Sequence, residues 1–247
     1  MCSSVDCART ASEHNITSGI QSAASFWQRI APTLSAERKP RALSGLSPWL
    51  RFGHLSAQRA ALDAGKHRGR FKDAVDSFHE ELIIRRELAD NFVWYQPRYD
   101  SVEGAKDWAK TSIDEHRGDA RAHLYTLEQL EGRKTHDKLW NAAQREMAVS
   151  GKMHGYMRMY WAKKILEWTE STEQALEFGI ALNDKYSLDG RCPNGFVGVA
   201  WSVMGIHDRA WGPVRPVFGK VRYMNDAGCK RKFDVPGYIA RCESLKG

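Results

Sequence analysis

The segment 152–168 constrains the fold most, because it reads as one uninterrupted helix that carries two tryptophans. Trp161 and Trp168 are seven residues apart, which is almost two turns of an α-helix, so their side chains are expected on one face. Trp140 lies twenty-one residues before Trp161, on what reads as the preceding helix. Each indole buries a large area, and these residues alone favour an ordinary hydrophobic core.

The remaining sequence predicts an all-α fold with one domain at residues 39–247, preceded by a Ser-rich leader at 1–38 that is poorly ordered or forms a single helix. No alternating pattern is long enough to predict a strand. The segment 189–198 is rich in Gly and Pro and reads as a loop. Helices are expected at about 56–64, 71–91, 105–113, 119–131, 138–149, 152–168, 171–183, 200–204 and 235–244.

Composition argues against several classes of protein. No apolar run approaches the roughly 18 residues needed to cross a bilayer, and the polar first residues do not resemble a secretory signal. We therefore expect an intracellular protein that does not contact membranes. The five cysteines form no C-x-x-C pair and the nine histidines are dispersed, so no metal site is expected. Signatures of zinc proteases, serine hydrolases and P-loop proteins are also missing from the sequence.

Positive charge is concentrated near the end of the chain. The net charge is +7, which favours polyanionic partners. A solvated basic surface and a phosphate-contacting surface both fit this pattern, and the second would make binding strongly dependent on salt. The basic residues of this region are Arg209, Arg215, Lys220, Arg222, Lys230, Arg231, Lys232, Arg241 and Lys246.

Two local patterns suggest an anionic ligand. Small residues at 44–47 run into a helix start, where amides and hydroxyls either bind a phosphate or simply cap the helix. Arg158 lies in an apolar helix and needs an anionic partner, because a buried unpaired guanidinium is costly. Asp189 is the best candidate for that partner, and residue types alone favour a structural salt bridge. The residues thus indicate a basic helical domain that holds a phosphate-bearing ligand beside tryptophans.

Six ordered blocks of sequence strongly resemble the class II cyclobutane pyrimidine dimer photolyases. The resemblance is collinear from about Pro40 to the end of the chain, and the blocks are Ala42–Ser56, Glu80–Phe92, Leu139–Gln144, Gly151–Trp168, Leu182–Arg191 and Arg215–Asn225. It implies the helical FAD-binding domain of the photolyase and cryptochrome type. The family's N-terminal α/β antenna domain is expected to be missing from this chain, and residues 34–39 depart from the family's flavin-binding pattern.

The resemblance also implies roles for individual residues. An FAD pocket is expected in which Asn183 faces flavin N5 and Arg158 pairs with Asp189 beside the ring; its residues are Leu43, Ser44, Leu46, Ser47, Arg158, Asn183, Asp189 and Asp208. Electron transfer between the surface and the flavin is expected through a tryptophan triad, Trp161 (nearest the flavin), Trp140 and Trp168.

A pocket for a flipped-out pyrimidine dimer is expected at Glu81, Met159 and Trp201, with Arg209 and Arg222 contacting the DNA. Trp201 offers a stacking surface, and Glu81 can hydrogen-bond the dimer. The resemblance therefore predicts a monomeric deoxyribodipyrimidine photolyase that uses reduced FAD to repair UV-damaged DNA in light. Two alternatives remain at this point, a cryptochrome-like photoreceptor or DNA-binding module, and an inactive truncated photolyase.

Overall fold

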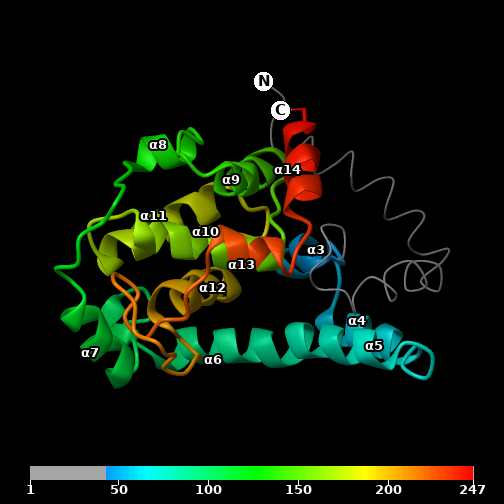
Figure 1. Cartoon of the computed structure of the whole chain (residues 1–247). Coiled ribbons are helices and arrows are strands. Elements are labelled where there is room, and N and C mark those ends of the chain that lie inside the picture. The colour runs from blue at the N-terminus through cyan, green and yellow to red at the C-terminus, as the bar shows by residue number, and fades with distance from the viewer. Residues whose placement is uncertain (1–42, 247) are drawn as a thin grey trace.

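The structure is a computed structural model that describes residues 43–246, which form helices joined by turns and loops (Figure 1). Within this range there is no β-strand, only an isolated bridge between Arg215 and Gly219. The expected all-α fold is therefore confirmed for the described residues. The leader expected at 1–38 and the departure expected at 34–39 lie outside them.

A long helical rod runs along the lower edge of the molecule in Figure 1. It consists of α5 (Lys72–His79), η1 (Glu80–Arg85) and α6 (Arg86–Tyr95), which follow one another without a break. The middle segment η1 is a π-helix, in which each turn holds an extra residue. The rod extends four residues beyond the expected end at residue 91, because Phe92 and Val93 pack against the main core.

Four helices build that core, namely α9 (Lys138–Ser150), α10 (Gly155–Glu167), α11 (Thr172–Tyr186) and α12 (Pro193–Met204). Helix α12 contacts α6 on one side and α10 and α11 on the other, and α14 (Val235–Glu243) packs on α9. The largest fully buried side chains include Trp140, Trp161, Trp168, Tyr160 and Tyr238. Aromatic rings of this size each bury about 150–250 Å², so they contribute much of the apolar stabilisation.

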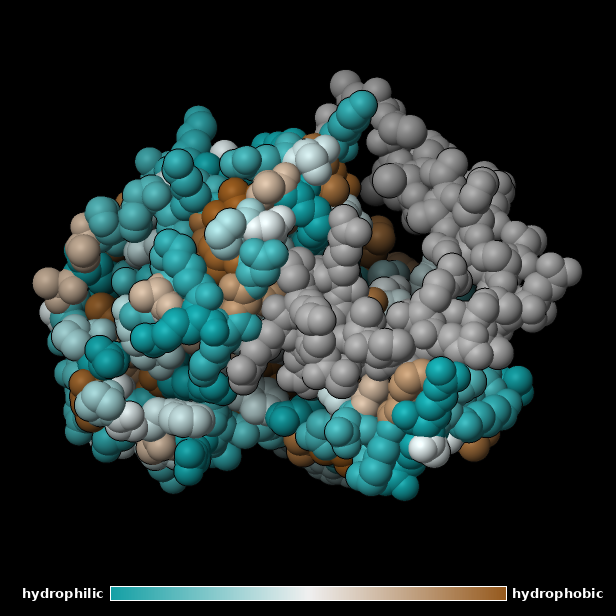
Figure 2. Space-filling model, turned by 45° about the vertical axis from the view of Figure 1, so that its right-hand side comes forward, coloured by the Kyte–Doolittle hydropathy of each residue, from teal (hydrophilic) through white to brown (hydrophobic). Residues whose placement is uncertain are grey.

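Shorter elements surround this core. They are α3 (Ser47–Arg51), α4 (Ala57–Gly65), η2 (Val102–Gly104), α7 (Asp107–Glu115), α8 (Leu127–Glu131) and α13 (Asp226–Lys230). Helices α4 and α5 share a second, smaller apolar cluster with η1, against which Leu46 and Leu50 also pack. The described surface in Figure 2 is mostly hydrophilic, and apolar side chains interrupt it in small groups. Among the helices of residues 43–246, none is long and apolar enough to cross a membrane.

Two expected elements differ from the observed ones. The helix expected at 119–131 is present only as α8, because earlier residues of that segment bind elsewhere. The carboxylate of Asp119 accepts a hydrogen bond from the Val217 amide at 2.8 Å, and the Tyr125 amide donates to the Trp168 carbonyl at 3.1 Å. The loop expected at 189–198 ends at Cys192, and α12 begins at Pro193. Gly195 lies within α12, where a Cβ would stand 2.8 Å from Asn183 Nδ2, so this glycine permits close helix packing.

Lys163 is a cation buried in the core, 2% exposed. Its Nζ donates to the Ser202 carbonyl of α12 at 3.0 Å. Burial lowers the pKa of Lys163 from 10.5 to about 7, an effect that Asp208 opposes and Arg222 reinforces. The unfolded chain keeps this proton up to about pH 10.5. The buried charge therefore lowers the free energy of unfolding by its full amount below pH 7, and this loss is recovered as pH rises from 7 to 10.5.

We therefore expect Lys163→Met to raise the free energy of unfolding by about 1–3 kcal/mol at pH 7 and to flatten its rise with pH. Urea unfolding at pH 7, 8 and 9 measures both effects. Lys185→Met is the matched control, because Lys185 is 61% exposed and pairs with Glu131 at the surface. A Lys163→Met variant less stable than the wild type at pH 7 would contradict this prediction.

Candidate functional site

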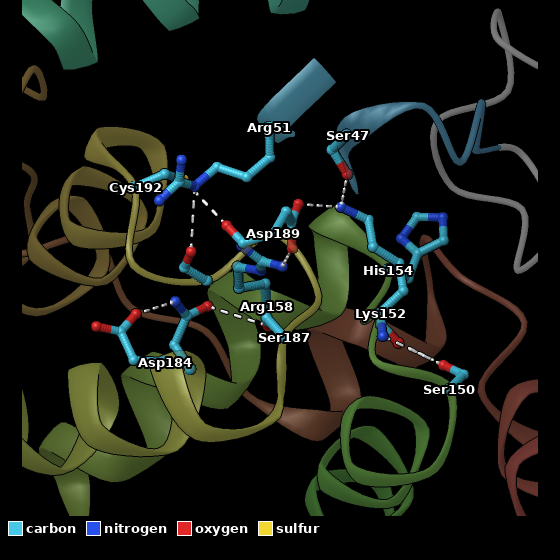
Figure 3. Close-up of polar contacts among 12 residues, drawn as sticks. Ser47, Arg51, Ser150, Lys152, His154, Arg158, Asp184, Ser187, Asp189 and Cys192 are labelled. Atoms are coloured by element: carbon cyan, nitrogen blue, oxygen red, sulfur yellow. Dashed lines mark hydrogen bonds and ion pairs between the residues drawn. The ribbon is translucent and has the colours of Figure 1, made fainter. Parts of the chain in front are cut away.

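Three charged side chains and a serine meet where four segments of the chain come together (Figure 3). Lys152 Nζ lies 2.6 Å from Asp189 Oδ2 and also donates to Ser47 Oγ. Arg158 Nη2 lies 3.8 Å from Asp189 Oδ1. We call these residues (Ser47, Lys152, Arg158 and Asp189) the charge cluster. The pairing expected between Arg158 and Asp189 is present, but Lys152, which the sequence did not single out, is the closer partner.

The loop between α9 and α10 brings Lys152 to Asp189. Helix α9 ends at Ser150 and is followed by the C-cap Gly151, which has a left-handed backbone with φ 68°; α10 begins only at Gly155, capped by the His154 side chain. The uninterrupted helix expected from residue 152 is therefore wrong for its first three residues. A Cβ on Gly151 would lie 2.4 Å from Leu188 Cγ, and the Leu188 amide donates to the Gly151 carbonyl at 2.8 Å. This close contact places Lys152 beside the residue that follows Leu188.

The cluster holds two positive charges and one negative charge in a poorly hydrated place. Side-chain exposure is 28% for Lys152, 18% for Arg158 and 10% for Asp189. Burial would raise the pKa of Asp189, but Lys152 and Arg158 outweigh it and hold that pKa at about 2. Burial also lowers the pKa of Lys152. Arg158 Nη2 and Asp189 Oδ1 are both buried and make no hydrogen bond within the described part of the chain.

The three expected tryptophans pack together in the core. Trp140 stacks on Trp161 with ring centroids 6.3 Å apart and an 8° angle between the planes, and it meets Trp168 edge-on at 5.8 Å. Trp140 therefore joins the other two rings. None of the three rings lies at the surface itself, and Trp168 is only 1% exposed. Its ring is covered edge-on by Tyr125 at 5.5 Å and by the exposed His136 at 5.2 Å.

Hydrogen bonds fix the orientation of two of these indoles. Trp161 Nε1 donates to Gln144 Oε1 at 2.8 Å, and Trp140 Nε1 donates to the Trp161 carbonyl at 3.0 Å. Gln144 is completely buried, and its Nε2 has no hydrogen-bond partner among the described residues. Sequence reasoning gave Gln144 no role, because a glutamine four residues after a tryptophan carries no signal of its own.

The other residues expected around FAD are divided between two places. Leu43, Ser44 and Leu46 are partly buried beside the cluster's Ser47, and Ser44 Oγ accepts a weak hydrogen bond from the Leu46 amide at 3.4 Å. Asn183, 2% exposed, bonds to Asp184 and Ser187 next to the loop that bears Asp189. Asp208 lies beyond the opposite end of α12, a helix of 12 residues and so about 18 Å long.

Asp208 belongs instead to a group of arginines and aromatic rings. Its Oδ1 accepts hydrogen bonds from the Arg209 amide and from Trp211 Nε1, at 2.8 and 2.9 Å. The guanidinium groups of Arg209 and Arg222 lie 4.6 and 4.9 Å from the centroid of the Trp211 ring. We call Arg209, Trp211 and Arg222 the arginine–tryptophan group. It holds two exposed cations in fixed positions.

The residues expected to contact a pyrimidine dimer come from three elements. Glu81 is exposed on η1, Met159 is 37% exposed on α10, and Trp201 is partly buried on α12. Arg85, four residues after Glu81 on the same π-helix, places its guanidinium 4.7 Å from the Trp201 ring centroid. This contact links η1 to α12. No group of three or more potential metal ligands occurs within residues 43–246.

Comparison with known proteins identifies the family. No family model matches the chain. Curated proteins named deoxyribodipyrimidine photo-lyase match it closely: that of Oryza sativa subsp. japonica is 63% identical over 209 residues (85% of this chain, 41% of the relative). The proteins of Arabidopsis thaliana and Potorous tridactylus are 61% identical over 207 residues and 58% identical over 221, covering 84% and 88% of this chain. The chain spans about two fifths of the length of these relatives. With identity this high over most of its own length, the chain belongs to the deoxyribodipyrimidine photo-lyase family.

Proposed function

We propose that this chain binds FAD at the charge cluster and uses it, in light, to split cyclobutane pyrimidine dimers in UV-damaged DNA, as a monomer inside the cell. One observation carries the proposal. Arg158 of the cluster and Trp161 of the aromatic array are three residues apart on α10, a spacing that puts both on one face of a helix. A charged ligand site and a stacked tryptophan path therefore adjoin each other.

The residues present fit a flavin. The isoalloxazine ring offers carbonyl acceptors and an imide N–H donor. The charge cluster and the adjoining tryptophans offer buried groups that make no hydrogen bond among the described residues, the donors Arg158 Nη2 and Gln144 Nε2 and the acceptor Asp189 Oδ1. Ser44 and Ser47 supply hydroxyls for the phosphates and ribose. Leaving such buried groups unpaired costs about 1–3 kcal/mol each, so a ligand that satisfies them gains affinity.

Bound reduced FAD supplies the light-driven electron, a step that belongs to the cofactor. The protein's part is to hold the dimer near it. A dimer inside a duplex is out of reach, so it must leave the stack, which costs a few kcal/mol and least for damaged bases. Trp201, backed by Arg85, provides a stacking face, and the Glu81 carboxyl can accept hydrogen bonds from base N–H groups. The two guanidinium groups of the arginine–tryptophan group can contact phosphates, which position the DNA without reading its sequence.

The deciding experiment compares one oligonucleotide with and without a thymine dimer. A gel shift with the full chain and reduced FAD measures the two affinities, and illumination of the complex followed by chromatography measures the dimers that remain. We expect tighter binding to the damaged DNA and loss of dimers in light only. Equal affinity for both DNAs and unchanged dimers after illumination would overturn the proposal.

Two substitutions separate lesion recognition from backbone binding. Trp201→Ala removes a stacking surface worth about 1–3 kcal/mol per base, so affinity for damaged DNA should fall about 5- to 150-fold while affinity for intact DNA stays the same. Arg222→Ala should weaken binding to both DNAs alike and reduce the salt slope by about one unit. Both are read from gel shifts between 50 and 200 mM salt. A uniform loss with Trp201→Ala would show that this ring supports the fold and does not stack on the lesion.

A further inference from the structure

The charge cluster contains more positive charge than its contacts balance. Among residues 43–246, Lys152 and Arg158 form ion pairs only with Asp189. The two other carboxylates on adjoining segments are occupied elsewhere: Asp184 accepts from the Arg191 amide and Asn183 Nδ2, and Glu146 pairs with Arg241 and accepts from Tyr238 and the His154 amide. A buried cation without a full counter-charge is costly. The site therefore favours an added anion.

The two cations contact opposite oxygens of Asp189. Arg158 faces Oδ1, on the side of α10 that it shares with Trp161. Lys152 binds Oδ2 and the hydroxyl of Ser47, on the side of the loop 43–47 (Figure 3). An added anion that is balanced by Lys152 thus belongs next to Ser47 and away from the tryptophans.

The chemistry of Lys152 fits a phosphate. An ammonium carries three donors; two are directed at Ser47 and Asp189, which leaves one for a ligand. A lysine acts as a compact point charge toward phosphate. Its main chain is held in place, because the Lys152 amide donates to Ser150 Oγ at 3.3 Å and Ser150 Oγ donates to the Lys152 carbonyl at 2.9 Å. The side chain, 28% exposed, remains accessible to a ligand.

We propose that Lys152, together with the Ser47 hydroxyl, binds the pyrophosphate of the dinucleotide cofactor. This inference rests on the proposed function and adds to it a residue with a specific ligand group. Arg158 and Asp189 contact the flavin ring, whereas Lys152 contacts the phosphates. The same carboxylate joins the two halves of the site.

The test compares ligands that differ in phosphate. Dissociation constants for FAD and for riboflavin, which has no phosphate, are measured by fluorescence on the full chain, as wild type, Lys152→Met, Lys152→Arg and the surface control Lys185→Met. We expect Lys152→Met to weaken FAD about 10- to 100-fold, the loss of one charge-assisted hydrogen bond, and to change riboflavin less than about twofold. Lys152→Arg should recover most of the FAD affinity, and Lys185→Met should match the wild type. Circular dichroism and the thermal midpoint show whether each variant is folded.

A second arm uses inorganic pyrophosphate alone, titrated by calorimetry into the protein without flavin. If the wild type binds pyrophosphate and Lys152→Met does not, the pyrophosphate site at Lys152 is supported. If the wild type then binds no flavin, only the proposed function fails. Equal weakening of FAD and riboflavin by Lys152→Met would overturn the inference and leave flavin binding intact. Wild-type protein that binds neither pyrophosphate nor FAD would overturn both.

Discussion

Replacement of Asp189 by Asn is expected to release the flavin and to lower the free energy of unfolding by about 3–5 kcal/mol, the usual cost of breaking a buried ion pair. The substitution leaves Lys152 and Arg158 facing a neutral amide in a site where Asp189 is only 10% exposed. The flavin-to-protein ratio after gel filtration and the urea midpoint measure the two effects. Asp226→Asn is the control, because Asp226 also pairs with a lysine but is 43% exposed. Unchanged flavin content in Asp189→Asn would contradict the assignment of this site.

The stability difference should depend on pH in a defined direction. The pKa of Asp189 is lowered from 3.8 to about 2 in the fold, so its contribution is fully present above about pH 4 and is lost as pH falls toward 2. The difference between wild type and Asp189→Asn should therefore be constant from pH 5 to 8 and shrink below pH 4. This window separates Asp189 from Lys163, whose effect lies above pH 7.

Trp161→Phe is expected to slow photoreduction of bound flavin by at least about tenfold, because it breaks the stacked pair that adjoins Arg158. Dimer repair by chemically pre-reduced protein should be nearly unchanged. Flavin absorbance under blue light with a thiol measures photoreduction. Trp108→Phe is the matched control, since Trp108 packs near Gly205 and α12, outside the array. Normal photoreduction in Trp161→Phe would show that the three rings serve only as core.

The same substitution carries a structural cost that must be measured separately. Phe cannot donate to Gln144 Oε1, which then joins Gln144 Nε2 as a buried group without a partner. We expect a loss of about 1–3 kcal/mol in the free energy of unfolding. Photoreduction is therefore compared at a temperature where unfolding experiments show both variants fully folded.

The sequence predicted those helices whose ends and buried faces are marked by local capping residues and apolar periodicity. Helices α9, α11 and α14 begin after the side-chain caps Asp137, Ser171 and Asp234 and lie within three residues of the expected ends, because capping and apolar periodicity are local. Helix α12 was missed in its first half for the opposite reason. Its glycines read as loop formers, whereas Gly195 is required by the nearness of Asn183, a contact twelve residues away in sequence.

The site was predicted in part for similar reasons. The pairing of Arg158 with Asp189 could be expected, because a cation in an apolar helix demands an anion. Lys152 escaped notice, since its position depends on a helix end at Gly151 and on the contact of that glycine with Leu188. Asp208 was placed with the flavin residues, but the length of α12 separates it from Asp189. Charge types are visible in a sequence, whereas distances set by packed helices are not.

The π-helix η1 lets the rod hold one residue more than a regular helix without changing which face of α6 meets the core. Each residue of a regular helix turns the chain by about 100°, and a π-helix turns it less per residue because its hydrogen bonds run from residue i to i+5. The six residues Glu80–Arg85 therefore rotate the chain about as far as five residues of regular helix. Deletion of one residue within η1 is expected to restore regular helix and to leave Ala89, 1% exposed, against the core and Trp94, 83% exposed, in solvent. Deletion of one residue within α5 would instead rotate α6 by about 100°, so alignments of homologues are expected to vary in length within η1 more than within the flanking helices.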